Sequence, residues 1–258
     1  MSEISCNITG KGPALVLLHG FCESKEIWDE FATALSDEYT VICPDLPGFG
    51  ASKSLAHVTM ETLAEAVFKF LSGQKITEFV IVGHSLGGYV ALALAEHNPI
   101  AIKGLGLFHS TSFPDSPEKK ETRNKTAEFA KNNGVEAFIR PFVPPLFYPG
   151  NRERCKKDIE KLVEIGLKTP LQSIIDTTLA MRDRPDRTHV LSEAKYPILS
   201  IIGKNDGAVK LEDSLAQIHL PYKSYVQILG DTAHQGLFEK KEETIKMVRA
   251  FCESVYSS

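Results

Sequence analysis

The sequence contains few cysteines, and no two of them form a short metal-binding or redox motif. The five thiols are odd in number, widely separated and without a C-x-x-C pair: Cys6, Cys22, Cys43, Cys155 and Cys252. This scatter argues against a zinc ribbon and a redox dithiol. Isolated thiols are typical of reduced, mostly buried cysteines in a reducing compartment, so a cytoplasmic location is expected.

An excess of basic residues and long apolar runs are also absent. The 29 basic and 33 acidic residues give a formal net charge of −4. A nucleic-acid backbone requires a concentrated basic face, so no nucleic-acid partner is expected. The segment Met1–Cys6 does not resemble a signal peptide, and apolar stretches such as Tyr89–Ala95 have the length of core elements. No membrane insertion is therefore expected.

The composition that remains is that of an ordinary globular protein. Of the 258 residues, 43% are hydrophobic and 24% are charged, which allows one large domain, or a core domain with an insertion. Short apolar runs alternate with helix-like segments, a pattern typical of β-α-β units in a mostly parallel sheet with helices on both faces. Six runs are predicted to be strands: Ala14–His19, Thr40–Cys43, Glu78–Gly83, Gly104–Phe108, Pro197–Gly203 and Ser224–Leu229.

These runs are continuous rather than alternating, as expected of strands covered on both faces. Glu3–Ile8 is predicted to add an antiparallel edge strand. The segments between the strands predict five helices: Glu26–Ser36, Met60–Ser72, Leu86–His97, Leu211–Ile218 and Lys240–Val255.

One stretch, from Thr111 to Lys195, contains no predicted strand. Helical patterns cover Asp115–Asn132, Arg152–Lys168 and Leu171–Arg182. Between the first two, the segment Pro141–Pro149 is too rich in proline for a helix or a central strand. The sequence thus predicts a helical insertion of roughly 80 residues in the sheet.

The most informative segment is Gly83-His84-Ser85-Leu86-Gly87, a Gly-x-Ser-x-Gly pattern between a predicted strand and a predicted helix. A serine hydroxyl is a poor nucleophile until a base removes its proton. A sharp strand-to-helix turn would project Ser85 Oγ above the sheet edge. The helix that follows would offer the amide of Leu86 and the positive end of its dipole to a developing oxyanion. We therefore identify Ser85 as the candidate nucleophile.

A second oxyanion donor is expected from the strand that ends in His19-Gly20-Phe21. Gly20 would let the chain turn toward Ser85 so that the Phe21 amide supplies this donor. His19 is open to two interpretations, as a catalytic base or as a structural residue that bonds the neighbouring loop. Asp45, in a turn rich in proline and glycine, is interpreted as a structural anchor.

The acid and the base are sought after the later strands. Asp206 follows the predicted strand Pro197–Gly203, and His234 follows the last predicted strand and precedes the last helix. The order Ser, Asp, His is the one found in this kind of site, where the carboxylate orients the imidazole and the imidazole takes the serine proton.

Other candidates fit less well. His109 follows the strand Gly104–Phe108, which is the wrong strand for the base, and it is interpreted as a pocket or packing residue. His84 flanks Ser85 and is expected to point away along the turn. Asp231 lies only three residues before His234, too near in the chain to reach the imidazole Nδ1.

Taken together, these segments resemble the α/β-hydrolase superfamily, in its small cap-bearing serine esterase and lactonase branch. The resemblance rests on His19-Gly20-Phe21, the Asp45–Ser52 turn, Gly83–Gly88, Gly203–Asp206 and His234, in this order along nearly the whole chain. It implies an α/β-hydrolase core over residues 1–110 and 196–258 and a helical cap over residues 111–195. It also implies that neither a metal nor an organic cofactor is needed.

Three hypotheses for function remain. The first is hydrolysis of an ester, thioester or lactone of a small apolar substrate through an acyl-Ser85 intermediate. The second keeps the fold but changes the chemistry: carbon–carbon bond hydrolysis, elimination as in the menaquinone-pathway synthase, hydroxynitrile cleavage or perhydrolysis. The third is a ligand receptor with little turnover.

The phenylalanine-rich segment Phe138–Tyr148 bears on the substrate. It either walls an apolar acyl pocket, with Phe142, Leu146 and Phe147 as candidate pocket residues, or merely packs the cap. The sequence leaves the physiological substrate and the oligomeric state open.

Overall fold

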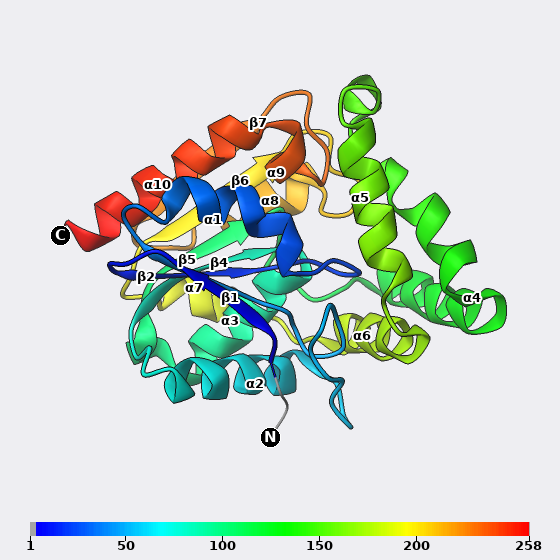
Figure 1. Cartoon of the computed structure of the whole chain (residues 1–258), viewed down its shortest axis with the longest axis horizontal. Coiled ribbons are helices and arrows are strands. Elements are labelled where there is room, and N and C mark those ends of the chain that lie inside the picture. Colours follow the sequence, from blue (N-terminus) through cyan, green and yellow to red (C-terminus); the bar gives the residue numbers. More distant parts are fainter. Residues whose placement is uncertain (1–3, 258) are drawn as a thin grey trace.

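A computed structural model describes residues 4–257 of the chain (Figure 1). Its centre is a seven-stranded sheet with the strand order β1-β3-β2-β4-β5-β6-β7. The strands are β1 (Cys6–Thr9), β2 (Ala14–Leu18), β3 (Thr40–Pro44), β4 (Phe79–His84), β5 (Ile102–Phe108), β6 (Ile198–Gly203) and β7 (Ser224–Leu229). Only β1 runs antiparallel to its neighbour; the other pairs are parallel. The predicted fold class and the antiparallel edge strand are confirmed, although Glu3 lies outside the described residues.

The central strands are apolar because both faces of the sheet are covered. Every residue of β4 and β6 is buried. Helices α1 (Asp29–Leu35) and α10 (Lys241–Tyr256) lie on one face, and α2 (Met60–Gly73) and α3 (Leu86–His97) lie on the other (Figure 1). The expectation of two covered faces is wrong for β7, where Val226 and Ile228 are 39% and 43% exposed because this strand forms the sheet edge.

The predicted helices of the core are present, α3 with its predicted bounds and the others with shifted ends. A 3-10 turn, η1 (Lys25–Trp28), precedes α1, and α8 (Leu211–Gln217) follows β6. A short helix not predicted from the sequence, α9 (Gly236–Glu239), precedes α10. No helix within residues 4–257 is both long and apolar enough to cross a membrane.

Between β5 and β6 the described chain forms only helices and turns. These are α4 (Pro117–Phe142), the 3-10 turns η3 (Pro144–Leu146) and η4 (Pro149–Asn151), α5 (Lys156–Leu167), α6 (Leu171–Asp183) and α7 (Thr188–Ser192). The predicted end of the first helix at Asn132 lies two residues before a kink in α4 at Gly134, whose φ of 82° and ψ of 175° are not helical. A second helical segment, not predicted from the sequence, then runs through Pro141 to Phe142.

Helices α4, α5 and α6 stand together beside the core, whereas α7 lies with the core (Figure 1). Two buried arginines fix the chain between α6 and α7. The Arg184 guanidinium lies 2.6 Å from Asp115 Oδ1 and 4.1 Å from the centre of the Tyr89 ring on α3. Arg187 bonds Glu96 of α3 at 3.0 Å and also pairs with Glu61 of α2. The end of the insertion is therefore anchored to the core by charge.

Candidate active site

Ser85 occupies the turn between β4 and α3, in a backbone conformation that side-chain-bearing residues rarely adopt. Its φ and ψ are 49° and −112°. The turn is tight because glycines flank it: a Cβ on Gly83 would overlap the backbone of Gly87 and Gly88, and a Cβ on Gly87 would overlap the backbone of Leu18. The Gly-x-Ser-x-Gly spacing thus has a steric cause.

This backbone strain gives a first testable consequence. Residues held in sparsely populated backbone regions cost about 1–3 kcal/mol, whereas glycine adopts them freely at an entropic cost of about 0.5–1 kcal/mol. We expect the free energy of unfolding of Ser85→Gly to be about 1 kcal/mol larger than that of Ser85→Ala, so that the glycine variant is the more stable one. Both variants lose the hydroxyl, so denaturant titration of the pair measures the backbone strain minus the entropic cost of glycine. Equal stability of the two variants would limit the strain at this turn to that entropic cost and would contradict the expectation.

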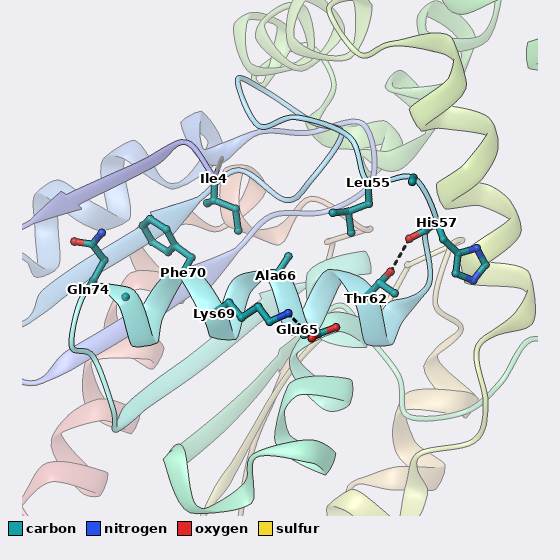
Figure 2. Close-up of a pocket in the computed structure, with 11 residues that line it drawn as sticks. Ile4, Leu55, His57, Thr62, Glu65, Ala66, Lys69, Phe70 and Gln74 are labelled. Atoms are coloured by element: carbon teal, nitrogen blue, oxygen red, sulfur yellow. Dashed lines mark hydrogen bonds and ion pairs between the residues drawn. The ribbon is translucent and has the colours of Figure 1, made fainter. Parts of the chain in front are cut away.

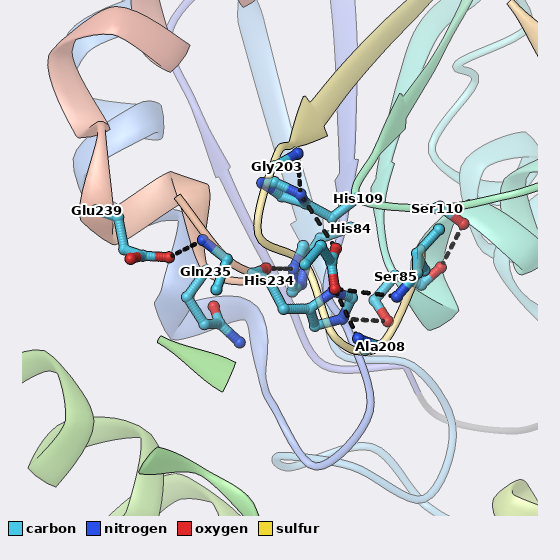
Figure 3. A network of polar contacts seen from close by, with 12 residues as sticks. His84, Ser85, His109, Ser110, Gly203, Ala208, His234, Gln235 and Glu239 are labelled. Atoms are coloured by element: carbon cyan, nitrogen blue, oxygen red, sulfur yellow. Dashed lines mark hydrogen bonds and ion pairs between the residues drawn. The ribbon is translucent and has the colours of Figure 1, made fainter. Parts of the chain in front are cut away.

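Two later loops bring His234 and Asp206 to Ser85, and Figure 3 shows the His234 ring beside Ser85. His234 Nε2 lies 2.8 Å from Ser85 Oγ, and His234 Nδ1 lies 2.8 Å from Asp206 Oδ2. The other carboxylate oxygen, Asp206 Oδ1, accepts hydrogen bonds from the backbone N–H groups of Ala208 and Val209 at 2.8 and 2.9 Å. The structure therefore brings the predicted nucleophile, base and acid into one hydrogen-bonded chain.

The charge of Asp206 depends on its neighbours. The side chain is almost completely buried, and burial alone would raise its pKa. The adjacent His234 ring lowers it further than burial raises it, so the pKa of Asp206 lies well below the ordinary carboxyl range. An ionised carboxylate at Nδ1 keeps a proton on that nitrogen and leaves Nε2 free to face the serine hydroxyl.

His109 lies behind Asp206 rather than in a pocket, which corrects its predicted position. Its ring is completely buried, its Nδ1 accepts the Gly203 N–H at 3.0 Å, and the same nitrogen lies 3.4 Å from Asp206 Oδ2. Burial lowers the pKa of His109 to about 4, so the ring is neutral at neutral pH. Of the two roles considered for His109, pocket residue and packing residue, its surroundings match the second.

The two expected backbone donors are Leu86, which directly follows Ser85, and Phe21, which follows β2, the strand paired with β4. Leu86 is the first residue of α3, where an N–H has no partner within the helix. The Phe21 N–H takes no part in the hydrogen bonds of residues 4–257. His19 bonds only backbone, with Nδ1 2.8 Å from Gly20 O and Nε2 accepting the Leu46 N–H at 2.9 Å. Of its two interpretations, the structural one is thus confirmed. The interpretation of Asp45 as an anchor is also confirmed, since it bonds Lys25 at 2.6 Å.

With this geometry established, comparison with known proteins identifies the family. Residues 13–147, more than half of the chain, match the family model of the alpha/beta hydrolase fold. The chain belongs to this family. A pimeloyl-[acyl-carrier protein] methyl ester esterase of Proteus mirabilis is 34% identical, over 99% of this chain and 98% of that protein. Another of the same name, from Methylococcus capsulatus, is 27% identical over 95% and 97%.

Solved structures agree with this assignment. A thermophilic esterase from Thermogutta terrifontis superposes with a TM-score of 0.93 at 30% identity, covering 98% of this chain and 94% of that one. The enol-lactonase from Burkholderia xenovorans LB400 has a TM-score of 0.90 at 23% identity, covering 97% and 96%, which demonstrates the shared fold. The chain is thus an enzyme of the α/β-hydrolase type.

In this α/β hydrolase, a cavity of about 360 Å³ opens beside the candidate base. It is lined by Pro141, Phe142, Pro145, Leu146, Gly207, Ala208 and His234. The predicted pocket positions of Phe142 and Leu146 agree with this lining. Phe147 is completely buried and packs against Phe238, with ring centroids 6.2 Å apart, so it is a packing residue and not part of the lining.

A larger cavity of about 1010 Å³ lies elsewhere, along α2 (Figure 2). Its lining includes Ile4, Leu55, Phe70 and the exposed ion pair of Glu65 with Lys69, and none of the three candidate catalytic residues. Within residues 4–257, no group of three or more His, Cys, Asp or Glu side chains is placed to hold a metal ion.

One buried carboxylate near the site was missed by sequence reasoning. Glu239 Oε1 accepts the Ala233 N–H at 2.9 Å, and Oε2 accepts the Tyr148 N–H at 2.9 Å. The neighbouring His234 N–H donates to Leu146 O at 2.9 Å. Asn151 of the insertion also donates to Asp231 O at 2.7 Å and to Glu239 Oε2 at 2.8 Å. The loop that carries His234 is therefore bonded to the insertion at several points, both directly and through Glu239. No local pattern marks Glu239, because its partners include residues about 90 positions away.

Proposed function

We propose that this α/β hydrolase cleaves carboxylic ester, thioester or lactone bonds of small apolar substrates through an acyl-Ser85 intermediate. The observation that carries the proposal is the pair of 2.8 Å contacts that link Ser85 Oγ through the His234 ring to Asp206. Such a chain removes the hydroxyl proton as the oxygen attacks. The names of the relatives, methyl ester esterases over nearly the whole length, support ester hydrolysis.

In the first half-reaction, Ser85 Oγ attacks the substrate carbonyl carbon and its proton passes to His234 Nε2. The carbonyl oxygen becomes an oxyanion that accepts hydrogen bonds from the Phe21 and Leu86 N–H groups, whose dipoles are fixed before the reaction. When the tetrahedral intermediate collapses, the bond to the alcohol oxygen or thiol sulfur breaks. The leaving group takes the proton from His234, and the acyl group remains on Ser85.

In the second half-reaction, a water molecule replaces the leaving group. His234 Nε2 takes one of its protons as the water oxygen attacks the acyl carbon, and the same two N–H groups hold the second oxyanion. Collapse breaks the bond to Ser85 Oγ, which regains its proton from His234, and a carboxylic acid leaves. Asp206 stays ionised throughout and stabilises the imidazolium that forms twice per turnover.

We also propose that residues 111–195 are a cap on a core formed by residues 1–110 and 196–258. Phe142 and Leu146 of this segment line the cavity beside His234. Phe21 contacts Phe142 and Phe138 at ring centroid distances of 6.0 and 6.2 Å, which joins the proposed oxyanion loop to α4. Apart from His234, no lining residue of the cavity is titratable, which supports an uncharged group as its occupant.

The test combines labelling with a substrate panel. A fluorophosphonate should form an adduct that mass spectrometry places on Ser85, and the purified protein should hydrolyse p-nitrophenyl esters with short, uncharged acyl chains. A matched ester whose acyl chain ends in a carboxylate should react at least about 10-fold more slowly in kcat/KM, because a charge that enters an apolar cavity loses its hydration.

The same panel includes a lactone, a β-diketone and a cyanohydrin. Turnover of the β-diketone or the cyanohydrin without turnover of any ester or lactone would replace the proposal with carbon–carbon or hydroxynitrile chemistry. An adduct on Ser85 with no turnover of any compound would favour a receptor.

A further inference from the structure

Behind the candidate triad lies a second, fully buried pair of ionisable side chains, Glu23 and His84. Glu23 is 4% exposed and His84 is completely buried. His84 Nδ1 lies 3.0 Å from Glu23 Oε2. Sequence reasoning did not single out Glu23, and it expected His84 merely to point away along the turn.

The contacts of the His84 ring indicate its protonation state. Nε2 lies 2.9 Å from the backbone carbonyl oxygen of His234, which only accepts hydrogen bonds, so Nε2 carries a proton. Nδ1 faces a carboxylate that already accepts the Gly20 N–H at 2.6 Å and the Gln235 side-chain N–H at 2.9 Å. Donors on both oxygens favour the ionised carboxylate, so the second proton belongs to Nδ1 and the ring is an imidazolium.

The electrostatics of the pair point the same way. Burial would raise the pKa of Glu23, but the charge and hydrogen bond of His84, together with the hydrogen bonds from Gln235 and Gly20, lower it to about 2. Burial would lower the pKa of His84, but Glu23 outweighs burial and raises it.

This pair touches each of the three turns on which the proposed chemistry depends. Glu23 bonds Gly20, the residue before the Phe21 donor, and Gln235, the residue after His234. His84 directly precedes Ser85, and its ring bonds the backbone of His234 (Figure 3). One carboxylate and one imidazole thus connect the oxyanion turn, the nucleophile turn and the base loop.

We propose that Glu23 and His84 form a permanent buried ion pair that positions His234 and the Phe21 turn relative to Ser85. Both are positioning residues, since they act through the backbone and do not touch the reacting atoms. Only the expected effect of this ion pair on kcat rests on the proposed function. The charge state of His84 is measurable whether or not an ester is hydrolysed.

Four other ionisable groups interact with His84 and bear on its charge. The His234 and His109 rings lie 5.1 and 6.2 Å from it, centroid to centroid, and the charges of Asp206 and His19 also act on the cluster. Burial lowers the pKa of both His109 and His19, which leaves these two rings neutral. Glu23 and Asp206 are then the anions of the cluster, and only Glu23 bonds the His84 ring.

The first measurement is made on the wild-type protein. With 15N-labelled histidine, NMR at about pH 8, above the ordinary pKa of histidine, should show one buried ring with protons on both nitrogens. In Glu23→Gln this signal should disappear and the His84 ring should become neutral. Glu239→Gln is the matched control, because it also neutralises a buried carboxylate beside the base loop but one without a histidine contact. The doubly protonated signal should persist in this control.

The second measurement is kinetic. A misplacement of reacting groups by about 1 Å is enough to slow catalysis about 100-fold. We expect Glu23→Gln to lower kcat for a p-nitrophenyl ester by about 10- to 100-fold, with KM changed less than about threefold. A role confined to folding would instead lower the melting temperature and leave kcat of the folded fraction unchanged.

A wild-type His84 ring that is neutral at this pH would overturn the ion pair, even if Glu23→Gln failed to fold. Folded Glu23→Gln with wild-type kcat would overturn the positioning role. If the wild-type protein hydrolyses no ester while the doubly protonated ring is present, the proposed function fails and the ion pair stands.

Discussion

Ser85→Ala is expected to lower kcat for ester hydrolysis on the order of 10⁶-fold, because the variant lacks the hydroxyl proposed to form the acyl intermediate. Within residues 4–257, Ser85 Oγ is the only nucleophile candidate in contact with His234 Nε2, at 2.8 Å. The cavity and the backbone donors remain in the variant, so substrate should still bind. Initial rates of p-nitrophenyl ester hydrolysis at saturating substrate give kcat directly.

Ser192→Ala is a suitable control, since Ser192 is exposed on α7 and bonds only His189 O. It should keep wild-type turnover. Loss of a nucleophile lowers kcat far more than about 100-fold. If Ser85→Ala kept more than about 1% of wild-type activity, another residue would therefore perform the attack.

Asp206→Asn is expected to lower kcat by about 10⁴-fold, although the side chain keeps its shape. The asparagine oxygen can still accept the N–H groups of Ala208 and Val209, so the loop should stay folded. Its amide group, however, would donate to His234 Nδ1. The imidazole would then carry its proton on Nε2, where it faces Ser85 Oγ and cannot accept the serine proton.

The control for this variant is Asp231→Asn, which removes the same charge from the loop that carries His234. Asp231 is exposed, and Asn tolerates its positive φ of 48°. Its kcat should stay within about twofold of wild type, as expected of a surface substitution. If both variants lost kcat to a comparable extent, the loss would be due to the net charge near His234. Asp206 would then have no specific role in the proposed mechanism.

Much of this site could be predicted from the sequence because the fold imposes order on it. Ser85, Asp206 and His234 each follow a strand, and the carboxyl ends of parallel strands meet at one edge of the sheet. An apolar run, a turn and a helix are local patterns, so the segments of β4 and α3 were predicted to within one residue. The same logic located Phe21 and Leu86 on neighbouring turns.

What sequence reasoning missed depends on contacts between distant segments. Glu23 meets Gln235 across 212 positions, and neither residue belongs to a periodic pattern. The interpretation of His109 as a pocket residue depended on its place after β5, which does not reveal that Asp206 and Gly203 enclose its ring. The cavity likewise combines residues of three separate segments, around the end of α4, after β6 and after β7, so its shape could not be deduced from any one of them.

The bonds between the base loop and the insertion have a consequence for how new specificities arise in this family. His234 N–H donates to Leu146 O, and Glu239 accepts the Tyr148 N–H. Asn151 donates to Asp231 O and to Glu239 as well. A chimera that exchanged residues 111–195 for the equivalent segment of another hydrolase would therefore replace all of these hydrogen-bond partners along with the cavity wall. Selectivity and turnover would be inherited together, and a successful exchange would have to preserve the backbone course of residues 146–148.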